Sequence, residues 1–206
     1  MTNRYQILIE YVGSGFAGWQ KQKNSKSVQN CIQFAISKLL KHKVAVYGSG
    51  RTDAGVHAIE QSAHFDTKHK IKNLNAFLKS LNFFLNKKNI SILKVVKKNL
   101  KFHARHSAKM RYYLYIIRNN ISPSVINYNR EWHIIKPLDI SLLNAGTKKL
   151  IGTHDFSTFR ASGCNAKSPI RSIKSVKIKK TKNKIELEFR SQSFLKQQVR
   201  SMVGCL

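Results

Sequence analysis

The chain has 206 residues, of which 42% are hydrophobic, and a formal net charge of +29 from 38 lysines and arginines against nine acidic residues. This length suits one sizeable core or two small ones, and no run approaches the ~20 apolar residues of a membrane span. So large a positive excess repels itself unless a polyanion neutralises it, which favours a nucleic-acid partner. Codon drift toward lysine is an alternative source of part of the charge, and charge alone does not separate DNA from RNA.

The N-terminus and the cysteines bear on location. The stretch MTNRYQILIEYVG enters a strand pattern at once, without the zones of a signal peptide, so we expect a cytoplasmic protein. The cysteines, Cys31, Cys164 and Cys205, are odd in number and far apart. They form neither a disulfide framework nor a zinc box, which fits a reducing compartment.

Apolar spacing predicts six elements in the first half of the chain. They are a strand over Tyr5–Tyr11, a helix capped by Ser27, strands over Val44–Tyr47 and Val56–Asp66, a helix around Leu74–Leu81, and a strand over Ile90–Val96. The order β-α-β-β-α-β is the split arrangement of ferredoxin-like sheets.

The second half starts the same order again. We expect a strand over Met110–Ile117, a helix in DISLLNAGTKKL, a hairpin of Ile170–Lys179 with Ile185–Arg190, and a helix over Phe194–Leu206. This β-α-β-β-α order is one strand short of a second copy. The sequence therefore predicts an α+β fold of two ferredoxin-like halves, residues 1–105 and 106–206, with one joined antiparallel sheet and no final strand in the second half.

The motif GSGRTDAGVHA, which begins at Gly48, places an aspartate in a tight turn of a chain with few acids. It matches neither a P-loop nor a dinucleotide fingerprint, because a strand follows instead of a helix. One interpretation is a turn in which Asp53 hydrogen bonds nearby backbone amides. The other is a site: Gly48, Gly50 and Gly55 remove bulk around Arg51 and Asp53, so that a planar ligand can approach.

The motif resembles the signature of the TruA family of tRNA pseudouridine synthases. Four further blocks resemble family blocks in family order: FAGWQKQ (16–22), FHARHSA (102–108) with RYYLY just after, GTHDFSTFRA (152–161) and SFLKQQVRSMVG (193–204). The resemblance thus covers essentially the whole chain.

This resemblance implies a fold and an activity. The family fold has two ferredoxin-like (RNA-recognition-like) halves, a joined sheet and a central basic cleft. The family reaction detaches uracil from its ribose and rejoins it through C5, without a metal or organic cofactor. The implied substrate is the tRNA anticodon arm, at positions 38, 39 and 40, and the implied assembly is a homodimer.

The resemblance also assigns roles to single residues. Asp53 matches the catalytic aspartate, and cleavage of a C–N glycosidic bond develops positive charge that a carboxylate can stabilise or trap. Arg51 matches the arginine that enters the RNA and holds the target base flipped out. Tyr113 matches the tyrosine that packs on that base, and Arg200 matches the arginine that pairs with the catalytic carboxylate.

Two stretches correspond to tRNA-contacting segments of the family. They are FHARH (Phe102, His103, Ala104, Arg105 and His106) and GCNAK (Gly163, Cys164, Asn165, Ala166 and Lys167). The spacing of His103 and His106 could suggest a metal, but two neutral ligands without a third make a poor site. We therefore expect an RNA-facing or packing role for both histidines.

The chain departs from the family pattern in three places. Gln198 replaces a methionine, Asn86 replaces a proline, and family members continue beyond Leu206 through a segment that ends in a strand. One alternative function is a non-catalytic RNA-binding or RNA-chaperone module of the same fold. A DNA-binding architectural protein has only the charge in its favour, because no helix-turn-helix or zinc signature is present.

Overall fold

The computed structural model describes residues 2–206, which fold into two compact units divided between Ala108 and Lys109. Both units combine helices with a β-sheet, so the predicted α+β class is confirmed. None of the helices in the described residues has the length and apolarity that a bilayer crossing requires.

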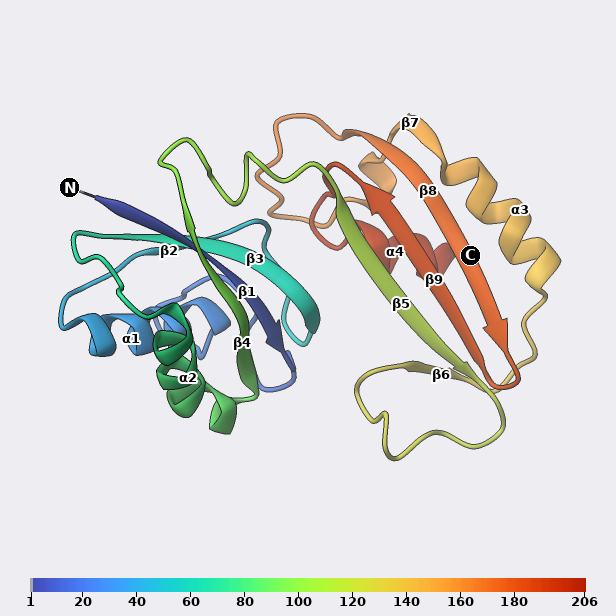
Figure 1. Ribbon diagram of the computed structural model, residues 1–206. Coiled ribbons are helices and arrows are strands. Elements are labelled where there is room, and N and C mark those ends of the chain that lie inside the picture. Colours follow the sequence, from blue (N-terminus) through green and yellow to red (C-terminus); the bar gives the residue numbers. More distant parts are fainter. Residues whose placement is uncertain (1) are drawn as a thin grey trace. The chain divides into compact units, whose positions relative to one another are not determined.

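The first unit is a four-stranded antiparallel sheet with two helices on one of its faces (Figure 1). Its elements are β1 Asn3–Tyr11, α1 Val28–Leu40, β2 Val46–Gly48, β3 Ala58–Thr67, α2 Leu74–Leu85, the 3-10 turn η1 Asn86–Lys88 and β4 Ile90–Lys98. The strands lie in the order β2-β3-β1-β4. All six predicted elements are present, although β2 and β3 each begin two residues later than expected.

Strand β1 shows why this sheet has a single buried face. Tyr5, Ile7, Ile9 and Tyr11 alternate along the strand and are almost fully buried, because successive side chains of a strand point to opposite faces. Helices α1 and α2 supply the other side of this core.

Side-chain caps fix where both helices begin. Ser27 Oγ accepts a hydrogen bond from the Asn30 amide at 3.3 Å, and Asn73 Oδ1 accepts one from the Ala76 amide at 2.9 Å. Each cap satisfies an amide that has no partner inside the helix. The cap predicted at Ser27 is therefore confirmed.

The second unit is a five-stranded mixed sheet in the order β6-β5-β9-β8-β7. Its elements are β5 Arg111–Asn119, β6 Trp132–Ile134, α3 Ile140–Leu150, β7 Gly152–Asp155, the 3-10 turn η2 Ser157–Phe159, β8 Ile170–Thr181, β9 Lys184–Ser191 and α4 Gln198–Cys205. The expectation of one joined antiparallel sheet is corrected in two ways. Hydrogen bonds divide the strands into two sheets, and β6 pairs parallel with β5.

The predicted hairpin forms the centre of the second sheet. Ile185, Leu187 and Phe189 of β9 are fully buried, as their alternation predicts. They pack with Leu143 of α3 and Met202 of α4 in one core cluster. The second unit therefore has a core of its own.

Helix α4 is shorter than predicted, because the segment before it is held in another shape. Gln197 has a left-handed backbone with φ 58°, which precedes the helix. The side-chain oxygen of Gln198, a fully buried residue, accepts a hydrogen bond from the Leu195 amide at 2.8 Å. Gln198 thus closes the turn that leads into α4.

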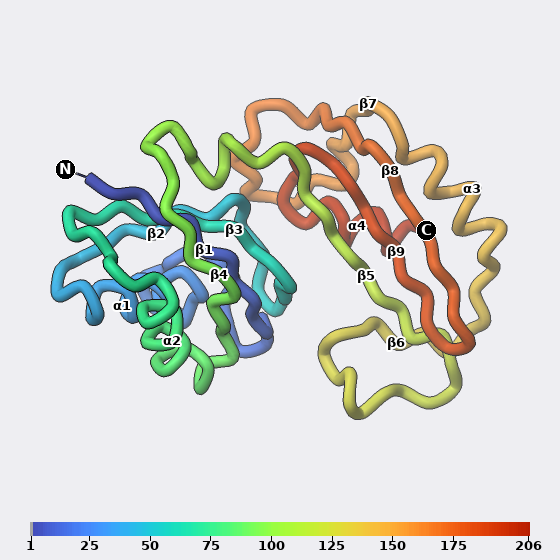
Figure 2. Tube along the Cα trace, viewed as in Figure 1, coloured from blue at the N-terminus to red at the C-terminus, as the bar shows by residue number. Residues whose placement is uncertain are grey.

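The sequence did not predict the short edge strands β6 and β7. Residues 120–131 form a long excursion between β5 and β6, which the chain trace shows clearly (Figure 2). β6 is only three residues long, and all four residues of β7 are exposed. β6 is therefore too short for its alternation to identify a strand, and β7 has no buried side chain to mark it.

Candidate active site

The GSGRTDAGVHA motif forms the connection between β2 and β3, and it lies against the loop that joins β1 to α1. Backbone hydrogen bonds tie the two loops together: the Trp19 amide donates to Thr52 O at 3.0 Å, and the Gly55 amide donates to Phe16 O at 3.4 Å. The Gly13 amide also donates to Nδ1 of His57 at 3.1 Å. The loop is therefore fixed by a neighbouring backbone.

Glycines of the neighbouring loop allow this close approach. A Cβ atom on Gly13 would lie 2.1 Å from Val56 O, and one on Gly18 would lie 2.6 Å from Thr52 O. No side chain fits at these distances. The β1–α1 loop thus needs glycine where it touches the motif.

The glycines inside the motif differ in their surroundings. The sequence predicted that Gly48, Gly50 and Gly55 leave space for a ligand. A Cβ on Gly48 would instead meet the indole ring of Trp19 at 2.7 Å, whereas Gly55 has open space around it and a left-handed φ of +78°. Packing against Trp19 explains the first glycine, and turn geometry explains the second.

The turn around Asp53 closes without its carboxylate. An aspartate that builds a turn accepts hydrogen bonds from amides two or three residues ahead. Here the Gly55 amide donates to Phe16 O and the Val56 amide donates to the backbone oxygen of Asp53 itself. The half-buried Asp53 side chain is therefore not what shapes the turn.

Two other aspartates show the contrasting behaviour. Asp139 Oδ1 accepts from the Ser141 amide at 2.7 Å, and Asp155 Oδ1 accepts from the Ser157 amide at 2.7 Å. In both cases the serine two residues ahead, through side-chain and backbone hydrogen bonds, holds the pKa of the aspartate below its ordinary value. Asp53 is thus not built into its turn in the way that Asp139 and Asp155 are built into theirs.

Arg51 lies two residues before Asp53 and is exposed. Its Nε donates to Oε1 of Gln20 at 3.1 Å. None of the ion pairs described among residues 2–206 joins Arg51 to Asp53. The guanidinium is thus held by the residue that follows Trp19 in the neighbouring loop.

Tyr113 and Arg200 belong to the second unit. Tyr113 of β5 pairs with the buried Phe189, and its half-buried ring meets the ring of Phe194 edge-on at 5.0 Å. The adjacent Tyr112 points to the opposite face and is 61% exposed. Arg200 is exposed on α4.

Side chains brace the stretch Gly163–Lys167 from within the second unit. Nη2 of Arg160 donates to the backbone oxygens of Cys164 at 2.6 Å and of Ala166 at 2.8 Å. Lys196 Nζ donates to Ser162 O at 3.0 Å. One arginine therefore fixes the fold of this predicted RNA-binding stretch.

The stretch Phe102–His106 lies at the end of the first unit. Ala104 is buried, whereas Arg105 and His106 are exposed. The rings of His103 and His106 are 4.5 Å apart between centroids. Among residues 2–206, no group of three histidine, cysteine or acidic side chains could hold a metal ion.

Sequence reasoning missed a polar network next to this stretch, made by Arg4, His64 and Asp66. Arg4 Nε and Nη2 donate to the two carboxylate oxygens of Asp66, each at 2.7 Å. The hydrogen bond from Arg4 is the main cause that lowers the pKa of Asp66. The signal that could have found it is the one that marked Asp53: an acidic residue in a chain with only nine.

Burial of His64 predicts a pH dependence of folding. Burial, and then the charges of Arg4 and His103, lower the pKa of His64 to about 4, against ~6.5 in an unfolded chain. Between these values the unfolded state binds more protons, so stability is complete above pH ~6.5 and falls as the pH drops toward 4.

The first unit should therefore lose roughly 1 M in its urea midpoint between pH 7 and pH 4.5. Urea unfolding of the full chain, with hydrogen–deuterium pulse labelling followed in β1 and β3, measures this loss. His64→Gln should reduce the slope. An equal slope in both proteins would contradict the assignment to His64.

Comparison with known proteins gives one family. The profile of the tRNA pseudouridine synthase family matches residues 7–107 and 147–206. A tRNA pseudouridine synthase A of Pelagibacter ubique is 63% identical over 203 residues, which are 98% of this chain and 82% of the relative. The same enzymes of Ehrlichia canis and Ehrlichia chaffeensis are 45% and 47% identical over 206 residues, which are 98% of this chain and 83% of each relative.

Proposed function

The chain belongs to the tRNA pseudouridine synthase A (TruA) family, isomerases that convert uridine to pseudouridine in tRNA, and we propose that it acts at positions 38, 39 and 40 of the anticodon arm, with Asp53 as its catalytic residue. The observation that supports the assignment of Asp53 is the turn in which the amides of Gly55 and Val56 donate to backbone oxygens. A side chain that the fold does not need is available for chemistry.

The reaction requires an anionic group at the sugar. Separation of uracil from ribose develops positive charge at C1′, and an ionised carboxylate stabilises this charge or traps it covalently. A carboxylate held by a rigid backbone needs little rearrangement at the moment of reaction. The hydrogen bonds between the two loops support this role for Asp53.

Three further residues complete the proposed chemistry. Arg51, which is exposed, enters the RNA and holds the target base out of its stack, since base extrusion costs a few kcal/mol. Tyr113 packs on the extruded base, and Arg200 pairs with the catalytic carboxylate. Sequence similarity to the family supports these roles.

We also propose the finer features of the family fold. The β-α-β-β-α-β order of the first unit, with strands ordered β2-β3-β1-β4, supports a ferredoxin-like arrangement. The order β7-β8-β9-β5 repeats β2-β3-β1 with one short strand added, which supports a second such half. A basic cleft, a homodimer and action in the cytoplasm, where tRNA is modified, complete the proposal.

The second half is proposed to accept one more strand. In the first unit β4 pairs along nearly the whole of β1, whereas β6 pairs only with Ile117–Asn119 of β5. A strand beside residues 111–116 would give the second sheet the arrangement of the first. It would also cover an edge that is otherwise open to pairing with other chains.

An unmodified tRNA transcript tests the proposed activity. After incubation with the protein, pseudouridine is mapped by carbodiimide labelling and primer extension. We expect modification at positions 38–40. Tight binding without any pseudouridine would instead identify the non-catalytic RNA-binding module.

Salt should weaken tRNA binding steeply. Each phosphate that a lysine or arginine neutralises releases counterion, so the logarithm of affinity falls linearly with the logarithm of salt concentration. With a net charge of +29, we expect a slope of about −4 or steeper in filter binding between 50 and 300 mM KCl. A slope near zero would contradict a broad electrostatic footprint.

A further inference from the structure

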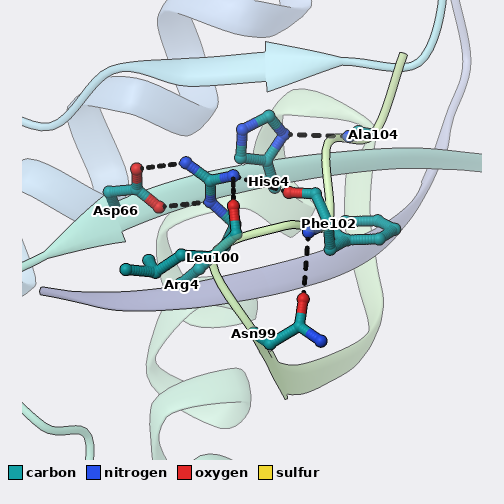
Figure 3. A network of polar contacts seen from close by, with 7 residues as sticks. All are labelled: Arg4, His64, Asp66, Asn99, Leu100, Phe102 and Ala104. Atoms are coloured by element: carbon teal, nitrogen blue, oxygen red, sulfur yellow. Dashed lines mark hydrogen bonds and ion pairs between the residues drawn. The ribbon is translucent and has the colours of Figure 1, made fainter. Parts of the chain in front are cut away.

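The loop Asn99–Ser107, which follows β4, is held by side chains from β1 and β3. Arg4 of β1 donates from Nη1 to the backbone oxygens of Leu100 at 2.8 Å and Phe102 at 2.6 Å (Figure 3). The Nε and Nη2 edge of the same guanidinium donates to the carboxylate of Asp66 in β3. One arginine thus joins a strand pair to two carbonyls of the loop.

Imidazole rings hold the next part of the same loop. Nδ1 of the buried His64 accepts from the Ala104 amide at 3.2 Å (Figure 3). Nδ1 of His103 accepts from the amides of Arg105 at 3.2 Å and His106 at 3.4 Å. Three successive amides therefore donate to two imidazoles, both of which must carry no proton on Nδ1.

The environment favours this neutral state. Burial is the main cause that lowers the pKa of both His64 and His103, and the charge on Arg4 acts in the same direction. The two rings lie 4.6 Å apart between centroids. A ring that stays neutral remains an acceptor for the loop amides at neutral pH.

Apart from Leu100, which is 55% exposed, the side chains that this loop exposes are cationic or polar. Lys101, Arg105, His106 and Ser107 are exposed, and the loop contains no acidic residue. A loop ordered before binding loses less entropy when it meets its partner. The contacts of Arg4 and His64 that order this loop would therefore favour binding in addition to stability, to which a partly exposed ion pair contributes only ~0–1 kcal/mol.

We propose that Arg4, Asp66 and His64 are positioning residues, which hold the Asn99–Ser107 loop in the shape that presents Arg105 and Lys101 to the phosphates of tRNA. This inference rests on the proposed function, in which Phe102–His106 contacts RNA. None of the three residues needs to touch the RNA. They act through the loop.

The charge of Asp66 gives a test in which two explanations predict opposite signs. Asp66→Asn removes one negative charge, so electrostatics alone predicts tighter binding to a polyanion. Positioning predicts weaker binding, because Arg4 loses its carboxylate partner and is then no longer held where it hydrogen bonds the backbone oxygens of Leu100 and Phe102. We expect the Kd for tRNA to rise about five- to tenfold, with kcat at saturating tRNA within about twofold.

Glu188→Gln is the matched control. Glu188 pairs with Arg190 in the second sheet, its side chain is 34% exposed like that of Asp66, and its replacement changes the charge equally. This variant should bind tRNA as tightly as the wild type or slightly more tightly. If Asp66→Asn does the same, positioning is refuted.

Trypsin reports the shape of the loop without RNA. In Asp66→Asn and Arg4→Gln, cleavage after Lys101 and Arg105 should accelerate at least about tenfold, while Arg190→Gln behaves as the wild type. Arg4→Lys, which keeps the charge but loses the fork of donors, should lie between. Thermal unfolding shows that each variant is folded, and unchanged cleavage in folded Arg4→Gln would overturn the proposal.

A double-mutant cycle separates the inference from the function beneath it. If Arg105 contributes only when Arg4 has placed the loop, then Arg4→Gln with Arg105→Ala should bind tRNA no more weakly than Arg4→Gln alone. Additive losses would refute positioning and leave the loop as an RNA contact. Wild-type binding by Arg105→Ala would instead refute that contact, and the tRNA role of the network with it.

Discussion

Asp53→Asn should abolish pseudouridine formation while tRNA binding persists. The amide keeps the shape of the carboxylate but is a poor nucleophile and carries no charge to stabilise a cationic sugar. We expect the single-turnover rate to fall by at least about 10³-fold and the Kd for tRNA to stay within about twofold. Quench-flow assays on a transcript and filter binding measure the two quantities.

The geometry of the loop lets this comparison separate a loss of charge from a change in the shape of the turn. The amides of Gly55 and Val56 are bonded to backbone oxygens, so the turn should keep its shape when the side chain changes. Asp139→Asn is the control, because Asp139 caps α3 and asparagine caps a helix as well as aspartate does. That variant should be fully active. Near wild-type turnover by Asp53→Asn would remove the catalytic assignment.

The sequence predicted the central elements well because their burial is periodic. In β1 and β9, every second side chain enters a core, and this alternation is visible without any structure. The cap at Ser27 could also be predicted from the sequence. A serine before an apolar helical stretch accepts a hydrogen bond from an amide that has no partner inside the helix. These features depend only on neighbours in the sequence.

The features that were missed depend on distant partners. β6 is a strand because Trp132–Ile134 pairs with the end of β5, and its own three residues do not predict a strand. The start of α4 depends on a buried glutamine that turns back to the Leu195 amide. The expected joined sheet was wrong because continuity of the chain says nothing about which strands share hydrogen bonds.

In the candidate site, too, local features could be predicted from the sequence and contacts between distant residues could not. The motif around Asp53 was evident in the sequence, but the reason for Gly48 was not, since Trp19 lies 29 positions earlier in the chain. The pairing of Arg4 with Asp66 joins residues 62 positions apart. Only the register of β1 against β3 places them side by side.

The contact between the two loops leads to the second large expected effect, which is a loss of activity in Gly18→Ala. Gly18 has a left-handed φ of +97°, and a Cβ there would lie 2.6 Å from Thr52 O and 3.2 Å from the carbonyl carbon of Asp53. Both neighbours are backbone atoms, so the loop that carries the carboxylate must move.

Gly15→Ala separates this displacement from ordinary backbone strain. Gly15 also has a left-handed φ, +83°, but a Cβ there meets nothing within 4 Å. Both variants therefore place alanine in a conformation that costs about 1 kcal/mol, and only Gly18→Ala displaces the loop that carries Asp53.

A displacement of ~1 Å at a reacting group can cost about 10² in rate. We expect kcat/KM to fall about 100-fold in Gly18→Ala and less than about threefold in Gly15→Ala, with both proteins folded by circular dichroism. Equal activity in the two variants would mean that the loop yields without moving Asp53. The rigid support that the backbone bonds give to the carboxylate would then have no part in catalysis.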